Sequence, residues 1–224
     1  RRWAAAQPAA ALEAFQACLE ATDDPVSQAD AYLGKGWALL ALDRPLEAAA
    51  AFERAAVGLP NPEARADAEL KRVEALAQAG RWADALAACD EFLRAHPLHP
   101  AARRVALVAV DALAHLGRDD EALHRIEALE QSPEAAAALL RRARLHERRQ
   151  AWSEAARAYA ELLERHPSAP EARWARLGLA LLHYRRADAE AAIRALAPLT
   201  TTNAADEVAE RAVVLQTWCH HLRG

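Results

Sequence analysis

The chain has 224 residues and a formal net charge of −4, and 53% of its residues are hydrophobic although only 5% are aromatic. Alanine makes up more than a quarter of the sequence, and this composition favours helix over both a sheet protein and a disordered one. The balanced charge argues against a nucleic-acid partner, and no apolar run approaches the ~18 residues needed to span a bilayer, so we expect no membrane span.

Prolines divide the chain into intervals of nearly constant length. Pro25, Pro60, Pro97, Pro133, Pro167 and Pro198 recur 35, 37, 36, 34 and 31 residues apart. A second break lies at a fixed phase between them, as at Gly80-Arg81, so each interval contains two helical stretches of about 14 residues. We therefore predict one array over 1–224, with a half repeat at 1–25, repeats at about 26–61, 62–99, 100–133, 134–168 and 169–203, and a terminal helix at 204–224.

The second helix of each predicted repeat has an alanine followed four positions later by a larger residue. This spacing, which places both residues on one helix face, occurs in Ala48-x3-Phe52, Ala85-x3-Cys89, Ala122-x3-Ile126 and Ala155-x3-Tyr159. Together with Trp174-x2-Leu177-Gly178 and the terminal prolines, the pattern resembles the tetratricopeptide repeat family. The resemblance implies an all-α, right-handed superhelical solenoid of antiparallel helix pairs, with the first helices on its concave side.

The predicted repeats depart from the family pattern in three respects. Repeats of 37 residues exceed the family's 34-residue unit, so we expect extended turns or helix ends. Val73, Val110 and Ala143 stand where the family has a first-helix glycine. We expect the inner turn of the repeat at 169–203 to contain one extra residue. In the terminal helix, we expect Trp218 to cover the last hairpin; the alternative is that it lies at an exposed cut edge.

Residues able to carry out chemistry are scattered along the chain. No glycine-rich loop and no G-x-S-x-G sequence occurs. His96-Pro97 and His166-Pro167 occupy the same phase of two repeats, which indicates a role at helix ends rather than in a zinc site. We therefore expect no catalytic residue, no metal and no cofactor, and we do not expect an enzyme.

The resemblance implies that a protein or peptide partner binds the first-helix side chains. Mapping by phase selects Trp37, Asp67, Glu74, Arg104, Asp111, Arg144, Arg148 and Arg176, with Arg173 as the alternative to Arg176. Residues 1–99 contain 10 basic and 15 acidic residues, whereas residues 100–224 contain 18 and 17. Because arginine forks bind carboxylates well, our hypothesis is that the later repeats accept an acidic segment. The alternative is a solvated face whose arginines pair with nearby glutamates.

The resemblance also bears on the role of the chain. We expect a protein–protein interaction scaffold. The segments 92–97 and 159–172 resemble repeats of bacterial envelope proteins, which favours the periplasm or cell envelope over the cytoplasm. The alternative is a regulatory or substrate-recruiting arm of a larger enzyme or signalling protein. Arginine greatly outnumbers lysine, which is typical of a G+C-rich bacterial genome, and the missing initiator methionine indicates a fragment of a longer chain.

Overall fold

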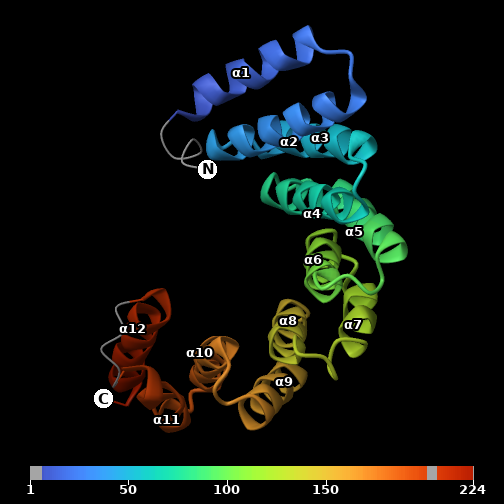
Figure 1. Ribbon diagram of the computed structural model, residues 1–224. Coiled ribbons are helices and arrows are strands. Elements are labelled where there is room, and N and C mark those ends of the chain that lie inside the picture. The colour runs from blue at the N-terminus through green and yellow to red at the C-terminus, as the bar shows by residue number, and fades with distance from the viewer. Residues whose placement is uncertain (1–6, 201–205, 224) are drawn as a thin grey trace. The chain divides into compact units, whose positions relative to one another are not determined.

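The computed structural model describes residues 7–200 and 206–223, and within these ranges it contains twelve α-helices and no strand (Figure 1). The helices are α1 (Pro8–Ala21), α2 (Pro25–Ala41), α3 (Pro45–Gly58), α4 (Pro62–Gln78), α5 (Trp82–Ala95), α6 (Ala102–His115), α7 (Asp119–Glu127), α8 (Ala135–Arg148), α9 (Trp152–Arg165), α10 (Pro170–Arg185), α11 (Ala189–Thr200) and α12 (Glu207–Leu222). The start of the predicted half repeat and the junction before the terminal helix lie outside the described residues.

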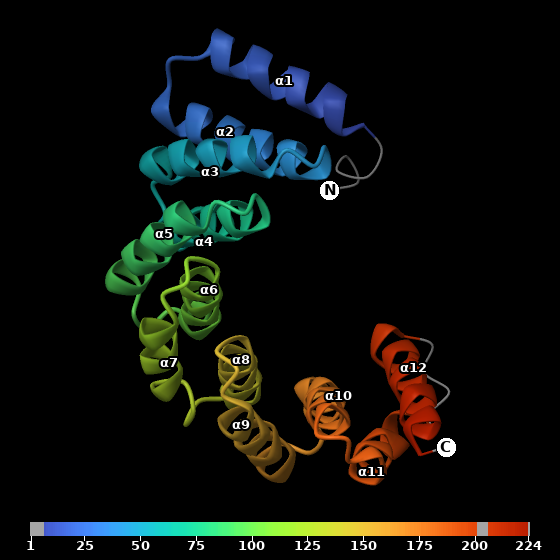
Figure 2. The same cartoon turned by 180° about the vertical axis from the view of Figure 1, so that it is seen from behind.

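The helices pack as antiparallel pairs, which confirms the all-α prediction. We call α2, α4, α6, α8, α10 and α12 the first helices, and the others the second helices. By contacts, the chain divides into an N-terminal half, residues 1–122, and a C-terminal half, residues 123–224. In the C-terminal half α10 lies between α8 and α12, as both views show (Figures 1 and 2).

Prolines and polar caps define where several helices begin. Proline occupies the first turn of α1, α2, α3, α4 and α10, where its missing N–H is not needed. Asp24 accepts a hydrogen bond from the backbone N–H of Ser27 at 2.8 Å, and Asp206 accepts one from that of Ala209 at 3.0 Å. These contacts satisfy donors that an N-terminal helical turn leaves open. His96 and His166 follow the last residues of α5 and α9, as the sequence predicts.

The inner turn of each full pair is closed in the same way. The residue after the first helix and its C-cap has a left-handed backbone, with φ between 56° and 73°; these residues are Asp43, Gly80, Gly117, Gln150 and Ala187. The next N–H then donates to the carbonyl five positions earlier, for example from Arg44 to Leu39 at 2.9 Å and from Asp188 to His183 at 3.0 Å. This is a Schellman closure, which glycine adopts without the strain that a Cβ brings.

The turn geometry corrects one prediction about the repeat at 169–203. Gly36 lies seven residues before the left-handed Asp43, and Ala143 lies seven before Gln150. The residue seven before Ala187 is Ala180, not Gly178. The prediction of one extra residue in this turn was therefore wrong, because Ala180 lies seven residues before its turn residue, as Gly36 does. Gly178 lies two positions before this equivalent residue.

Glycines in the first helices leave room for aromatic rings of the second helices. A Cβ added at Gly36 would lie 2.6 Å from Phe52 Cε1, and one added at Gly178 would lie 2.4 Å from Tyr159 Cζ. At the position equivalent to Gly36, the buried Val73 belongs to a repeat whose second helix has Cys89 instead of an aromatic residue. Side-chain volumes are thus complementary both within a pair, as at Gly36 and Phe52, and between successive pairs, as at Gly178 and Tyr159, as close packing requires.

Candidate functional site

Equivalent positions of the first helices can be assigned from the inner turns. The residues six positions before the left-handed residue of each turn are Trp37, Glu74, Asp111, Arg144 and Leu181. The first four belong to the set expected from the sequence. Leu181 was missed because of the two-residue phase error in α10.

In the N-terminal half, four of the expected residues meet around Lys71 of α4. Trp37 of α2 is 41% exposed and packs edge-on against Phe52, with ring centroids 5.7 Å apart. The Lys71 ammonium lies 5.0 Å from the centroid of the Trp37 ring and 2.7 Å from Glu74 Oε2. Arg104 of α6 also pairs with Glu74. The cluster therefore links three first helices by cation–π and ionic contacts.

The charges in this cluster are closely balanced. Burial lowers the pKa of Lys71, the positive charge of Arg104 lowers it further, and the negative charge of Asp67 opposes both effects. Asp67 is exposed, whereas Asp111 is half-buried in α6. Lys71 was not among the predicted residues, although it lies four positions after Asp67 and three before Glu74. That spacing places all three on one face of α4.

In the C-terminal half, two arginines lie against one tryptophan. Trp174 of α10 is half-buried and packs against two clusters of buried residues, one formed with α8 and α9 and the other with α11 and α12. The guanidinium carbon of Arg144, from α8, lies 5.6 Å from the centroid of the Trp174 ring, and that of Arg211, from α12, lies 5.7 Å from it. A guanidinium stacked on a ring keeps N–H groups at its edge for an anion.

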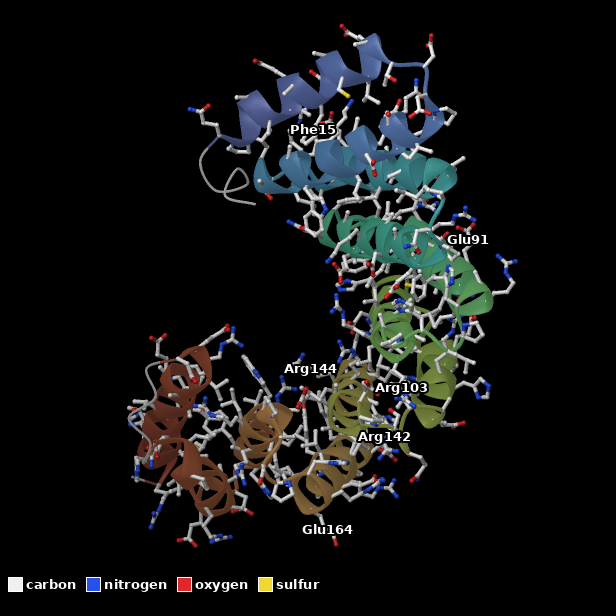
Figure 3. The ribbon with its side chains drawn as sticks, viewed as in Figure 1. Phe15, Glu91, Arg103, Arg142, Arg144 and Glu164 are labelled. Carbon is white, nitrogen blue, oxygen red and sulfur yellow. The ribbon has the colours of Figure 1, made fainter. Side chains whose placement is uncertain are left out.

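Other arginines of this half have structural partners. Arg142 pairs with Glu130 and with Glu161 of α9, and so lies on a different side of α8 from Arg144 (Figure 3). Arg173 contacts both carboxylate oxygens of Asp206, the cap of α12. The open choice between Arg173 and Arg176 therefore favours Arg176 as the arginine available to a partner.

Arg148 and Arg176 do not join the cluster around Trp174. Arg148 is exposed at the last residue of α8, and Arg176 is half-buried on α10. Arg176 is two positions from Trp174, and residues at that spacing do not face the same side of a helix. Of the three later residues predicted, Arg144 is the one that lies over the Trp174 ring.

One carboxyl of α8 is half-buried against α9. Glu147 is half-buried and accepts a hydrogen bond of 2.9 Å from the Tyr159 hydroxyl. Burial raises the pKa of Glu147, although that hydrogen bond and the charges of Arg185 and Arg144 oppose the rise. Burial and the nearby carboxylate also raise the pKa of Tyr159. This pair joins α8 to α9 and stabilises the hairpin.

A pocket of about 420 Å³ lies between α10 and α12. Its apolar lining consists of Leu177 and Leu181 from α10 and of Val214, Leu215 and Trp218 from α12, and Glu210 and Arg211 complete it. Trp218 is 53% exposed, so the prediction that it covers the last hairpin was wrong. Its ring instead lies 6.2 Å from that of Tyr184, at the pocket.

Two other kinds of site are absent from the described residues. Within 7–200 and 206–223, no cluster of three or more His, Cys, Asp or Glu side chains is arranged to hold a metal ion. Over the same ranges, none of the helices combines the length and the apolar character needed to cross a membrane.

Comparisons with family models and with solved structures both indicate tetratricopeptide repeats. The family model described as tetratricopeptide repeat matches residues 1–68, 70–126 and 120–170. The sequence has no significant match among curated proteins. Similar solved structures include a tetratricopeptide repeat protein from Parabacteroides merdae ATCC 43184, with a TM-score of 0.64 and 18% identity over 88% of this chain and 73% of that chain.

Two further structures resemble the chain. YrrB, described as a TPR protein with an unusual peptide-binding site, has a TM-score of 0.55 and 16% identity over 95% of this chain and 99% of that one. Yeast Tom70 has a TM-score of 0.64 and 17% identity over 95% of this chain but only 43% of its own. At these identities the likeness concerns the fold.

Proposed function

The chain belongs to the tetratricopeptide repeat family, and from that premise we propose that it is a non-enzymatic scaffold which binds a segment of a protein partner on its first helices. Members of the family are generally protein-interaction scaffolds, and their repeats are typically non-catalytic. The proposal extends this role to one array over 1–224 and to a particular surface.

We place the main binding surface on α8 and α10, with an acidic segment as the occupant. The observation that carries this assignment is the stacking of Arg144 and Arg211 on Trp174. The helices α8 and α10 contain seven arginines and two glutamates, so their side chains have a large excess of positive charge. Arginine pairs with carboxylates through two parallel hydrogen bonds, which gives both affinity and orientation. Arg148 and Arg176 extend the positive surface beyond the cluster.

The N-terminal half offers a second contact surface of different chemistry. Trp37 supplies exposed aromatic area, and Glu74 and Arg104 supply opposite charges next to it. Asp67 lies on the same helix as Glu74, and Asp111 lies on the same helix as Arg104, so this surface suits a partner segment of mixed charge. We propose that it contributes contact area, while the arginines of the C-terminal half select for acidic residues.

The experiment compares charge reversal on first and second helices. The test variant is Arg144→Glu with Arg148→Glu, and the control is Arg157→Glu with Arg194→Glu, which are exposed on α9 and α11 and change the net charge equally. Each protein is used as bait in native lysate, and captured proteins are quantified by mass spectrometry at two salt concentrations. We expect acidic partners retained by the control and lost from the test variant, with weaker capture at high salt. Equal capture by the two variants would eliminate the arginine surface as the site.

For cellular location, we propose a bacterial envelope complex. The support is the resemblance of segments 92–97 and 159–172 to repeats of envelope proteins. The alternative is an arm of a larger enzyme or signalling protein; in its favour, the similar region makes up only 43% of yeast Tom70, so arrays of this fold occur within longer chains. The full-length gene discriminates between them: a signal peptide or lipobox supports the envelope, and an attached catalytic domain supports the arm.

A further inference from the structure

We propose that the pocket between α10 and α12 receives one large apolar side chain of the acidic segment, so that the partner motif pairs a carboxylate with a nearby aromatic or leucine residue. This inference rests on the proposed function and narrows it. A pocket of about 420 Å³ lies within the range of ligand-sized cavities. Five of its seven lining residues are apolar.

The apolar residues of the pocket remain accessible in the chain. Val214 is 49% exposed and Trp218 is 53% exposed, although both belong to the lining. Covering such side chains with an apolar group removes their surface from water and stabilises the complex. Aromatic residues that are accessible in a concave site are also frequent anchors of protein interfaces.

The charges around the pocket indicate where the carboxylate binds. Arg211 pairs with Glu207 at 2.6 Å, and Glu210 lies in the lining, so the first turn of α12 repels a second negative group. Arg144 approaches Trp174 from α8, where arginines predominate. The carboxylate therefore lies on the α8 side of Trp174, and the apolar side chain lies beyond it, between α10 and α12.

The distances set the spacing of the motif. Trp174 and Leu181 are seven residues apart on α10, which corresponds to about 10 Å along the helix axis. The Arg144 guanidinium carbon, which comes from α8, lies 5.6 Å from the centroid of the Trp174 ring, whereas the pocket is lined by α10 and α12. An extended peptide advances about 3.3–3.6 Å per residue. The two lengths add to about 16 Å, so the acidic residue should lie no more than about five positions from the apolar one.

The test selects peptides and then changes the pocket alone. Random peptides of about twelve residues, displayed on phage, are panned on the whole 224-residue chain. Affinities of the selected peptides are then measured by fluorescence anisotropy for three variants: Val214→Asp, Val213→Asp and Arg144→Glu. Val213 is the matched control, because it is 51% exposed on the same helix but is not in the lining. Replacing the apolar residue of the peptide by alanine repeats the test without altering the protein.

The outcomes separate this inference from the proposed function. We expect selected peptides to contain the spaced pair, and Val214→Asp or the alanine peptide to bind about tenfold more weakly or worse, with Val213→Asp nearly unchanged. Loss of binding by Arg144→Glu but not by Val214→Asp or the alanine peptide leaves the acidic partner in place and overturns the pocket. Unchanged binding by all variants, or selection of peptides without acidic residues, overturns both.

Discussion

Gly36 allows a sharp test of how the helix pairs pack, because it faces the ring of Phe52. A Cβ at Gly36 would lie 2.6 to 2.8 Å from three ring carbons, and the ring is fully buried and has no room to swing aside. Overpacking of this kind costs about 1–3 kcal/mol, while replacing a helical glycine by alanine gains about 1 kcal/mol. We expect Gly36→Ala to destabilise the α2–α3 pair by about 1 kcal/mol net.

The sign of this effect should reverse when the ring is removed. In a Phe52→Leu background the added methyl group has space, so Gly36→Ala should stabilise the pair by up to about 1 kcal/mol. Hydrogen–deuterium exchange of the α2 and α3 amides reports the local free energy of opening, which suits a chain of neighbouring repeats. Equal destabilisation in both backgrounds would refute the reasoning, because Phe52 would then not be the obstacle.

The left-handed turn residues give a pair of opposite effects: Ala187→Gly should raise the free energy of unfolding by about 1 kcal/mol, and Gly117→Ala, whose Cβ would meet no atom within 4 Å, should lower it by about as much. Urea denaturation measures both, and shifts of the same sign would contradict the strain argument. Burial raises the pKa of Glu147, so the folded chain holds this proton more tightly than the unfolded chain, and the carboxyl lowers stability as pH rises above its unfolded pKa. Glu147→Gln keeps a hydrogen-bond acceptor, so the variant should become more stable relative to the wild type as pH rises from about 4 to 7. A difference in melting temperature between the two proteins that does not change with pH would exclude this. Arg142 binds two glutamates, so Arg142→Ala should lower the local stability of α8 and α9 by about 1–2 kcal/mol. The exposed Arg157→Ala should have little effect. Amide exchange in α8 and α9 compares the two, and equal protection would count against a structural role for Arg142.

The helix pairs were predictable because single residues in the sequence mark where most of their helices begin and end. Pro25 and Pro62 each begin a first helix, and Gly80 and Gly117 adopt the left-handed backbone that ends one. The error arose at Ala187, since alanine rarely adopts that backbone and does not mark a turn in the sequence. Gly178, which makes room for a ring of the preceding helix, then set the wrong phase.

The candidate site was predictable only in part, because a run of like residues does not reveal which side chains meet. Arg142 and Arg144 differ by two positions, or about 200° around a helix. Arg142 therefore binds Glu161 of its own hairpin and Glu130 of the preceding repeat, whereas Arg144 stacks on the next first helix. The roles of Arg211 and Trp218 depended on the correct phase of α10, which the sequence left two residues in error.

The Schellman closure of each inner turn has a consequence for biosynthesis. Both partners of its hydrogen bond are within six residues of each other, so the bond can form as soon as the following residue has left the ribosome. Each hairpin then needs only its immediate predecessor to bury its apolar face. Domains fold from the N-terminus during synthesis, and this chain can fold one hairpin at a time. A nascent chain of this kind exposes little more than one unpaired helix at a time to chaperones and proteases.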